Sequence, residues 1–221
     1  MCQLSDNFYY TDTLNKVQML NPVKILLPDT IFETLPLPKL IELIKDNFGH
    51  VHIIPIQRRH FNDKIGMQLI TRFCSTKSNN ILQVIARKYY CLSSASALLS
   101  FLKTVNLITF GQNCLKLDYQ TKQGGMMIDT ATSSRLELLY SQSTESNATK
   151  KFSLFAILNR CVTRIGQRHL RANILEPSCD IHFIRNRQEQ VRIMIENNEL
   201  LLQLKVEMSK HNVQQITVIY L

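Results

Sequence analysis

The sequence lacks several short motifs that are typical of enzyme families, and it has no tryptophan and only six glycines in 221 residues. No G-x-x-x-x-G-K-[ST] segment occurs, so the loop that holds the phosphates of a bound nucleotide is missing. G-x-S-x-G and H-E-x-x-H segments and a paired-carboxylate motif are absent as well. We therefore expect no catalytic residues, no cofactor-binding residues and no enzymatic activity of this chain by itself.

A metal site and a disulfide framework are also not indicated. His50 and His52 stand two residues apart, but no second pair could complete a metal site. The six cysteines are widely spaced and include no C-x-x-C pair, so we interpret them as reduced, mostly buried thiols. They are Cys2, Cys74, Cys91, Cys114, Cys161 and Cys179.

Long apolar runs are missing, and positive charge is in excess. No apolar stretch approaches the roughly 18 residues of a membrane-spanning helix, and the N-terminus lacks the apolar core of a signal peptide. We therefore expect a cytosolic or nuclear protein with no membrane partner. The formal charge of +9 favours an acidic partner, most commonly nucleic acid. Lys and Arg outnumber Asp and Glu by 14 to 9 in residues 1–129 and by 12 to 8 afterwards, so the excess is spread along the chain.

The first part of the chain alternates strand and helix signals. Apolar runs at residues 23–27 and 51–56 predict two buried strands. Pro38 begins and Gly49 ends a segment with apolar residues at helical spacing, and Asn62 is placed to cap a second helix. Strand, helix, strand and helix in this order predict an α/β layer with a partly parallel sheet, and two strands make only part of such a domain.

From about residue 80 the pattern becomes helical, with apolar stripes over residues 81–89 and 98–105. Arg87 and Lys88 stand directly before Tyr89 and Tyr90. Charge beside aromatic rings is one way to bind nucleic acid, but we favour a helix with buried tyrosine rings and a solvated basic edge.

The segments that follow are less regular before the chain becomes helical again. Residues 114–119 alternate like a strand, and residues 126–139 are expected to form a short non-helical insertion. Residues 141–151 are polar throughout and predict a loop. The fold class that we expect is α/β followed by mainly α, with the division near Arg87.

Residues 126–180 are the most informative part of the chain. Asp129 is expected to cap the turn that follows it, because no paired acid or histidine stands nearby to make it catalytic. Thr163 and Asp180 are placed to cap two later helices. Gly166 shares a helix face with Leu170 and with a further apolar residue. Since glycine costs about 1 kcal/mol of helix propensity, we expect this one to admit a neighbouring backbone.

Three arginines form a stripe on the same predicted helix: Arg164, Arg168 and Arg171. Such a stripe could follow the phosphates of DNA, because the planar guanidinium matches phosphate geometry. It could equally pair with carboxylates of a neighbouring helix or face water, and we favour pairing within the protein.

This part of the sequence resembles the start of the core (lever) domain of the MutS family of DNA mismatch-recognition ATPases. Asn173 departs from the usual Trp, and Ser178 departs from the usual apolar residue. Asn173 within R-x-N-I-L-E-P, together with residues 87–99, resembles the meiosis-specific members of the family. The positions that fit the family pattern are Ile128, Asp129, Leu136, Glu137, Leu138, Leu154, Phe155, Leu158, Asn159, Thr163, Gly166, Arg168, Leu170, Arg171, Ile174, Pro177 and Asp180.

The resemblance implies a partial connector domain, RNase H-like and α/β, over residues 1–87. It implies an incomplete helical core domain over residues 88–221, whose end at residues 213–221 is unlike the helical lever expected there. The ATP and magnesium site of the family lies in a P-loop domain outside this sequence, so no cofactor is expected here. Implied partners are branched or mismatched DNA and a second MutS homologue as a heterodimer partner, on chromosomes in the nucleus.

The resemblance also separates candidate DNA contacts from structural positions. The candidate DNA contacts are Arg164, Arg168 and Arg171. The structural positions are Asp129, Leu136, Glu137, Gly166, Leu170, Pro177 and Asp180. A mismatch-repair MutS is the alternative within the family, although its Phe-x-Glu wedge does not occur here. A non-catalytic interaction module is the alternative from a different class.

Overall fold

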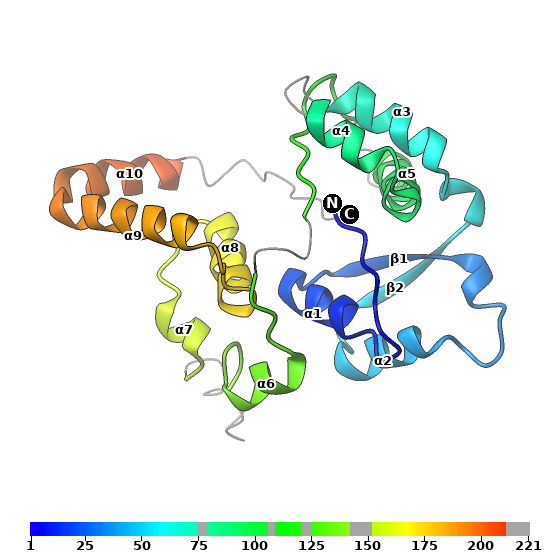
Figure 1. Cartoon of the computed structure of the whole chain (residues 1–221), viewed down its shortest axis with the longest axis horizontal. Coiled ribbons are helices and arrows are strands. Elements are labelled where there is room, and N and C mark those ends of the chain that lie inside the picture. Colours follow the sequence, from blue (N-terminus) through cyan, green and yellow to red (C-terminus); the bar gives the residue numbers. More distant parts are fainter. Residues whose placement is uncertain (75–78, 106–108, 121–124, 142–151, 211–221) are drawn as a thin grey trace. The chain divides into compact units, whose positions relative to one another are not determined.

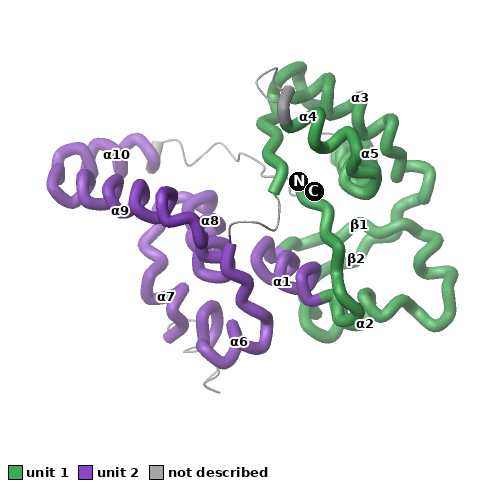
Figure 2. Tube along the Cα trace, viewed as in Figure 1, with its two compact units in different colours: residues 1–10, 22–121, 219–221 green, residues 11–21, 122–218 purple. Residues whose placement is uncertain are grey.

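The computed structural model describes residues 1–74, 79–105, 109–120, 125–141 and 152–210. Its described residues form two compact units (Figure 2): unit 1 holds residues 1–10 and 22–120, and unit 2 holds residues 11–21 and 125–210. Most of the expected polar loop and the β-branched cluster at residues 213–221 lie outside the described residues. None of the described helices combines the length and the apolar composition that a membrane span requires.

Unit 1 contains a two-stranded parallel sheet, β1 (Lys24–Pro28) beside β2 (His52–Ile56), in a register that pairs Lys24 with His52. A short 3₁₀ turn (Asp29–Ile31) and α2 (Lys39–Asn47) make the crossover that parallel strands require. The apolar side of α2 is buried at Ile41 and Ile44. The two predicted strands, the helix between them and the parallel pairing are thus confirmed.

Three helices and a turn complete unit 1 (Figure 1): η2 (Arg58–His60), α3 (Asp63–Phe73), α4 (Asn79–Ile85) and α5 (Tyr89–Thr104). Asn62 caps α3 as predicted, because its side-chain oxygen accepts a hydrogen bond from the Ile65 amide at 3.0 Å. The axes of α3 and α5 approach closely at Gly66, where an added Cβ would lie 2.1 Å from the carbonyl oxygen of Leu92. Ile70, Ile85 and Leu92 lie in the core that this contact encloses.

Two expectations for this region are wrong. The apolar stripe over residues 81–89 is not one helix, because α4 ends at Ile85 and the Lys88 amide closes the turn on the Ile85 carbonyl at 2.8 Å. Residues 114–119 form no strand. Only Leu115 pairs, through a single bridge to Cys74 at the end of α3, and one bridge does not extend into a ladder.

The division between the units falls between residues 120 and 125, whereas the sequence suggested a division near Arg87. The reason is that α5 packs on α3 and so stays with the strands and helices that precede it. Helical periodicity predicts helices in this region but carries no information about which element a helix packs against.

Unit 2 consists of six helices among its described residues: α1 (Thr11–Leu20), α6 (Thr130–Arg135), α7 (Leu154–Leu158), α8 (Arg164–Leu175), α9 (Ile181–Glu196) and α10 (Asn198–Lys210). The expected non-helical insertion at residues 126–139 is therefore wrong, because it contains α6. Helix α1 was not predicted; it packs against α6 and α8. Met19 on α1 joins Leu138, Leu139 and Leu175 in the buried core of this unit.

Candidate nucleic-acid interface

The Leu136-Glu137-Leu138 segment links α6 to the first turn of α7. Glu137 adopts a left-handed backbone conformation, with φ of 50°. The carbonyl oxygens of Glu137 and Leu138 accept hydrogen bonds from the amides of Leu154 and Phe155, at 3.1 and 2.9 Å. These amides open α7 and have no partner within their own helix. The segment therefore holds α7 in place. Leu138 is buried, whereas Leu136 is 62% exposed and contributes little packing.

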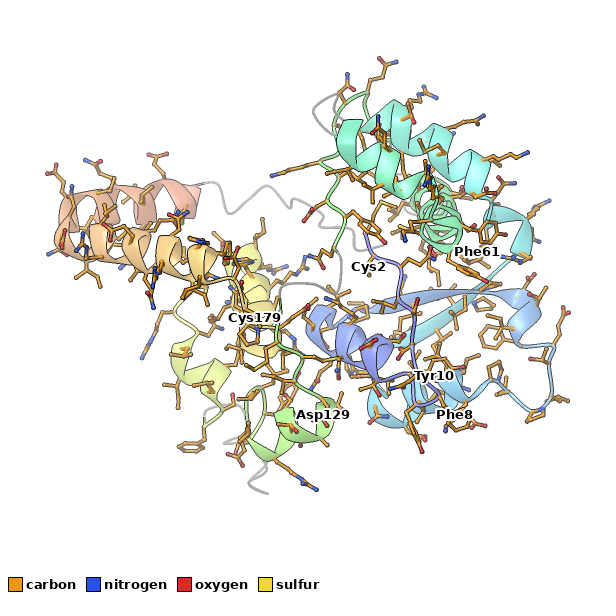
Figure 3. The ribbon with its side chains drawn as sticks, in the orientation of Figure 1. Cys2, Phe8, Tyr10, Phe61, Asp129 and Cys179 are labelled. Carbon is orange, nitrogen blue, oxygen red and sulfur yellow. The ribbon has the colours of Figure 1, made fainter. Side chains whose placement is uncertain are left out.

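Side-chain caps begin three helices, as predicted. Asp129, labelled in Figure 3, accepts a hydrogen bond from the Thr132 amide at 2.7 Å and starts α6. Hydrogen bonds from the side chain and the backbone of Thr132 lower the pKa of Asp129. This cap is present above the ordinary carboxyl pKa and is lost as the pH falls through the lowered value. Thr163 caps α8 through the Gly166 amide at 3.1 Å, and Asp180 caps α9 through the His182 amide at 2.9 Å.

The end of α8 pairs with the segment that leads into α6. The Met126 amide donates to the Pro177 carbonyl at 2.8 Å, and Gly125 forms an antiparallel bridge with Ser178. A Cβ on Gly125 would lie 2.7 Å from Cγ of Glu176, so a larger residue there would displace the Glu176 side chain. Pro177 therefore both ends α8 and accepts the hydrogen bond that holds this strand-like contact.

The prediction for Gly166 is wrong. The atoms nearest to an added Cβ are Oγ1 of Thr163 at 3.1 Å and Cβ of Cys161 at 3.4 Å, and both belong to the turn directly before α8. Leu170 is half-buried, and among the residues of α8 only Leu175 is fully buried. Gly166 thus makes room for the helix cap of its own helix rather than for a neighbouring backbone.

The arginine stripe of α8 divides into two parts with different environments. Arg171 is half-buried, and its Nε and Nη2 donate to the carbonyl oxygen of Gln18 on α1 at 3.2 and 2.9 Å. Its guanidinium also lies 5.8 Å from the centre of the Tyr140 ring. Arg171 therefore acts within unit 2, which agrees with the pairing that we favoured for the stripe.

Arg164 and Arg168 are exposed, and neither makes an ion pair with a described residue. Residues 146–175 include six Lys and Arg and no Asp or Glu. The side of α8 that carries these two arginines is consequently positive, with no carboxylate in its own stretch of sequence to neutralise it. Of the three candidate DNA contacts, these two have the exposure that a phosphate contact requires.

The cysteines differ from expectation in their burial. Cys74 and Cys91 are buried, Cys114 and Cys179 are exposed, and the others lie between these extremes; all six are free thiols. Burial raises the pKa of Cys91 to about 11, so its thiol stays protonated. Within the described part of the chain, no three His, Cys, Asp or Glu side chains come together as a metal site.

Comparison with known proteins agrees with the motifs in unit 2. Residues 131–217 match the family model of MutS domain III. The chain belongs to the MutS family. It is 33% identical to MutS protein homolog 4 of Mus musculus over 211 residues and 32% identical to that of Homo sapiens over 210 residues, in each case across 95% of the chain.

More distant relatives also align along most of the chain, over 92% and 95% of it. MutS protein homolog 4 of Saccharomyces cerevisiae is 30% identical over 212 residues, and the DNA mismatch repair protein MutS of Clostridium botulinum is 26% identical over 215 residues. The chain spans only 22% of the length of the mouse and human relatives.

Proposed function

We propose that this chain is the connector and the first part of the lever of a MutS homologue that acts in meiotic recombination. In this proposal it works with a second MutS homologue as a heterodimer, on chromosomes in the nucleus, and binds branched recombination intermediates to promote crossovers. The observation that carries the proposal is that the 30–33% identity to proteins named MutS protein homolog 4 covers 92–95% of the chain and hence both units. Unit 1, with its parallel strand pair and crossover helix, would be the RNase H-like connector.

The residues of unit 2 suit a scaffold that presents positive charge. Asp129, Thr163 and Asp180 fix the starts of three helices, and Arg171 fixes α1. Arg164 and Arg168 are left to face the solvent and meet phosphates. No step of chemistry is required of any of these side chains, since the family's ATP hydrolysis belongs to a different domain.

A gel-shift experiment distinguishes the proposal from its alternatives. The full chain is titrated with a four-way junction, a mismatched duplex and a plain duplex of equal length. Preference for the junction is expected. Preference for the mismatch would support a mismatch-repair MutS instead, to which the bacterial relatives are related by name. Equal, negligible binding of all three would support a non-catalytic interaction module.

We expect replacement of Arg164 and Arg168 by glutamine to weaken DNA binding without altering folding. Each phosphate contact contributes about 0.9 to the slope of log affinity against log salt concentration, so the double variant should lower that slope by roughly 2. Fluorescence anisotropy across a salt series measures it. The matched control replaces Arg185 and Lys205, exposed cations on α9 and α10 of the same unit, by glutamine. An equal loss in the control would mean that the attraction is diffuse, and would contradict a DNA contact specific to α8.

We also expect this chain to bind neither ATP nor magnesium–ATP. The sequence contains no phosphate-binding loop with its Lys and Ser or Thr, and its six glycines leave few positions for one. Isothermal titration of the chain with ATP and magnesium should give only the heat of dilution. Saturable binding with one ATP per chain would contradict this prediction.

A further inference from the structure

A long stretch of unit 1 carries positive charge alone. Residues 64–117 include seven Lys and Arg and no Asp or Glu. The described part of this range includes α4, α5 and all of α3 except its first residue, Asp63; none of these helices carries the arginine stripe of α8. Lys64 and Arg72 on α3 are exposed, as is Arg87 between α4 and α5. A surface with this balance attracts polyanions, because the cations outnumber the carboxylates around them.

A shallow groove of about 640 Å³ lies between α3 and the start of α5. Lys64, Gln68 and Arg72, spaced at one helical turn each, line its α3 side, and Asp63 is its single acidic residue. Leu92 lines the opposite side. The cations of α3 therefore follow one edge of a depression rather than scatter over a convex surface.

Two exposed aromatic rings stand in the chain between Ala86 and Leu92, which line this groove. Tyr89 and Tyr90 are 44% and 69% exposed, so the expectation that their rings are buried is wrong. They are the first two residues of α5, and their rings meet edge to face with centres 5.2 Å apart. Nη2 of Arg58 lies 3.5 Å from the Tyr89 hydroxyl, so a further cation adjoins the pair. Exposed tyrosine rings next to cations are the combination on which unpaired bases stack.

We infer that this surface binds single-stranded DNA. We call it the α3–α5 basic groove: Lys64 and Arg72 line the groove itself, and the exposed Arg87, Tyr89 and Tyr90 stand in the chain between two further lining residues, Ala86 and Leu92. The cations follow the phosphates, and the tyrosine rings stack on bases. A duplex offers the phosphates but keeps its bases stacked on one another, and an acidic peptide offers charge without planar groups. The inference deepens the proposed function, because branched DNA contains strands that can unpair at the branch point.

The test uses the full chain and a fluorescent oligothymidine strand of about 20 nucleotides, long enough for one binding site. Lys64→Gln with Arg72→Gln should lower the salt slope by about 1.4, since each contact to a single strand contributes roughly 0.7. The control is Lys24→Gln with Lys45→Gln, which removes the same charge from exposed positions of unit 1 outside the groove. Equal losses in the two variants would overturn the inference, because the attraction would then be diffuse.

Stacking is measured separately, by the quenching of tyrosine fluorescence. The chain has no tryptophan, so its tyrosine emission is not masked. Tyr90→Leu should weaken oligothymidine binding about tenfold and reduce the quenching of tyrosine emission, with duplex affinity unchanged. Tyr9→Leu, at a tyrosine of unit 1 with the same exposure within two percentage points, should change neither. Competition by polyglutamate as effective as that by oligothymidine would overturn the inference in favour of an acidic protein partner.

The outcome is separable from that of the proposed function. If both groove variants still prefer the junction, the proposed function is supported and the groove has no part in it. If the groove variants lose oligothymidine binding and the wild type shows no junction preference, the groove binds single-stranded DNA but the proposed function is wrong. Circular dichroism of each variant, with unfolding temperatures like that of the wild type, shows that the changes in binding are not losses of fold.

Discussion

Replacing Gly66 by alanine is expected to lower the free energy of unfolding by ~1–3 kcal/mol, through overpacking of the contact between α3 and α5. The new methyl carbon would lie 2.1 Å from the carbonyl oxygen of Leu92 and 2.8 Å from its carbonyl carbon. Both obstructing atoms are backbone, so no rotamer change relieves the overlap and the two helices must separate. Separation opens the core around Ile70, Ile85 and Leu92, where these side chains are 2%, 0% and 3% exposed.

The matched control is Gly166→Ala, at the other glycine that lies within a described helix. Alanine is favoured over glycine in a helix by about 1 kcal/mol. At Gly166 only Oγ1 of Thr163, at 3.1 Å, would have to shift, by tenths of an ångström, whereas Cβ of Cys161 at 3.4 Å is in ordinary contact. Stability should change little or rise. Urea unfolding followed by circular dichroism measures both variants. A Gly66→Ala protein as stable as the Gly166→Ala protein would contradict the close contact.

The capping residues and the strand pair were predictable from the sequence because their determinants are local. Asp129, Thr163 and Asp180 each accept a hydrogen bond from an amide two or three positions later, so residue type and position decide the cap. The two strands are short apolar runs separated by a helical segment, and that order is sufficient to predict parallel pairing.

The positions of the two helical glycines, in contrast, could not be distinguished from the sequence. Gly66 and Gly166 each interrupt an amphipathic pattern, and only the carbonyl of Leu92 makes one of them indispensable. The tyrosines at the start of α5 were misjudged for a related reason. The apolar periodicity predicted that they lie on a helix, but only the packing of α5 on α3 determines that Tyr89 and Tyr90 face outward.

The candidate DNA site was predictable only in part. The spacing of the three arginines on α8 placed them in one stripe, and the structure gives them that common helix. Their division into exposed and half-buried members depends on α1, whose Gln18 is 153 positions away from Arg171. With only ten residues, α1 left too weak a pattern to be anticipated.

Replacing Arg171 by glutamine is expected to release α1 from unit 2, at a cost of about 1.5–3 kcal/mol for hydrogen bonds that involve a charged donor. The carbonyl of Gln18 lies in the last turn of α1, where carbonyl groups lack intrahelical partners and carry the negative end of the helix dipole. Two guanidinium N–H groups fill this position. Arg171→Lys should lose less stability than the glutamine variant, since lysine keeps the charge without the planar two-donor geometry.

Hydrogen exchange of the α1 amides is the direct measurement, because it reports local opening separately from global unfolding. The control is Arg168→Gln on the same helix, an exposed position where a change within about 0.5 kcal/mol is expected. Lys16 and Glu176 form a second link between α1 and the end of α8, with side chains only 20% and 31% exposed. Because both links hold one helix, Lys16→Gln combined with Arg171→Gln should cost less than the sum of the single losses. Unchanged α1 protection in Arg171→Gln would show that the packing of Leu14 and Met19 and the Lys16–Glu176 pair hold the helix without Arg171, and that Arg171 is free to contact DNA.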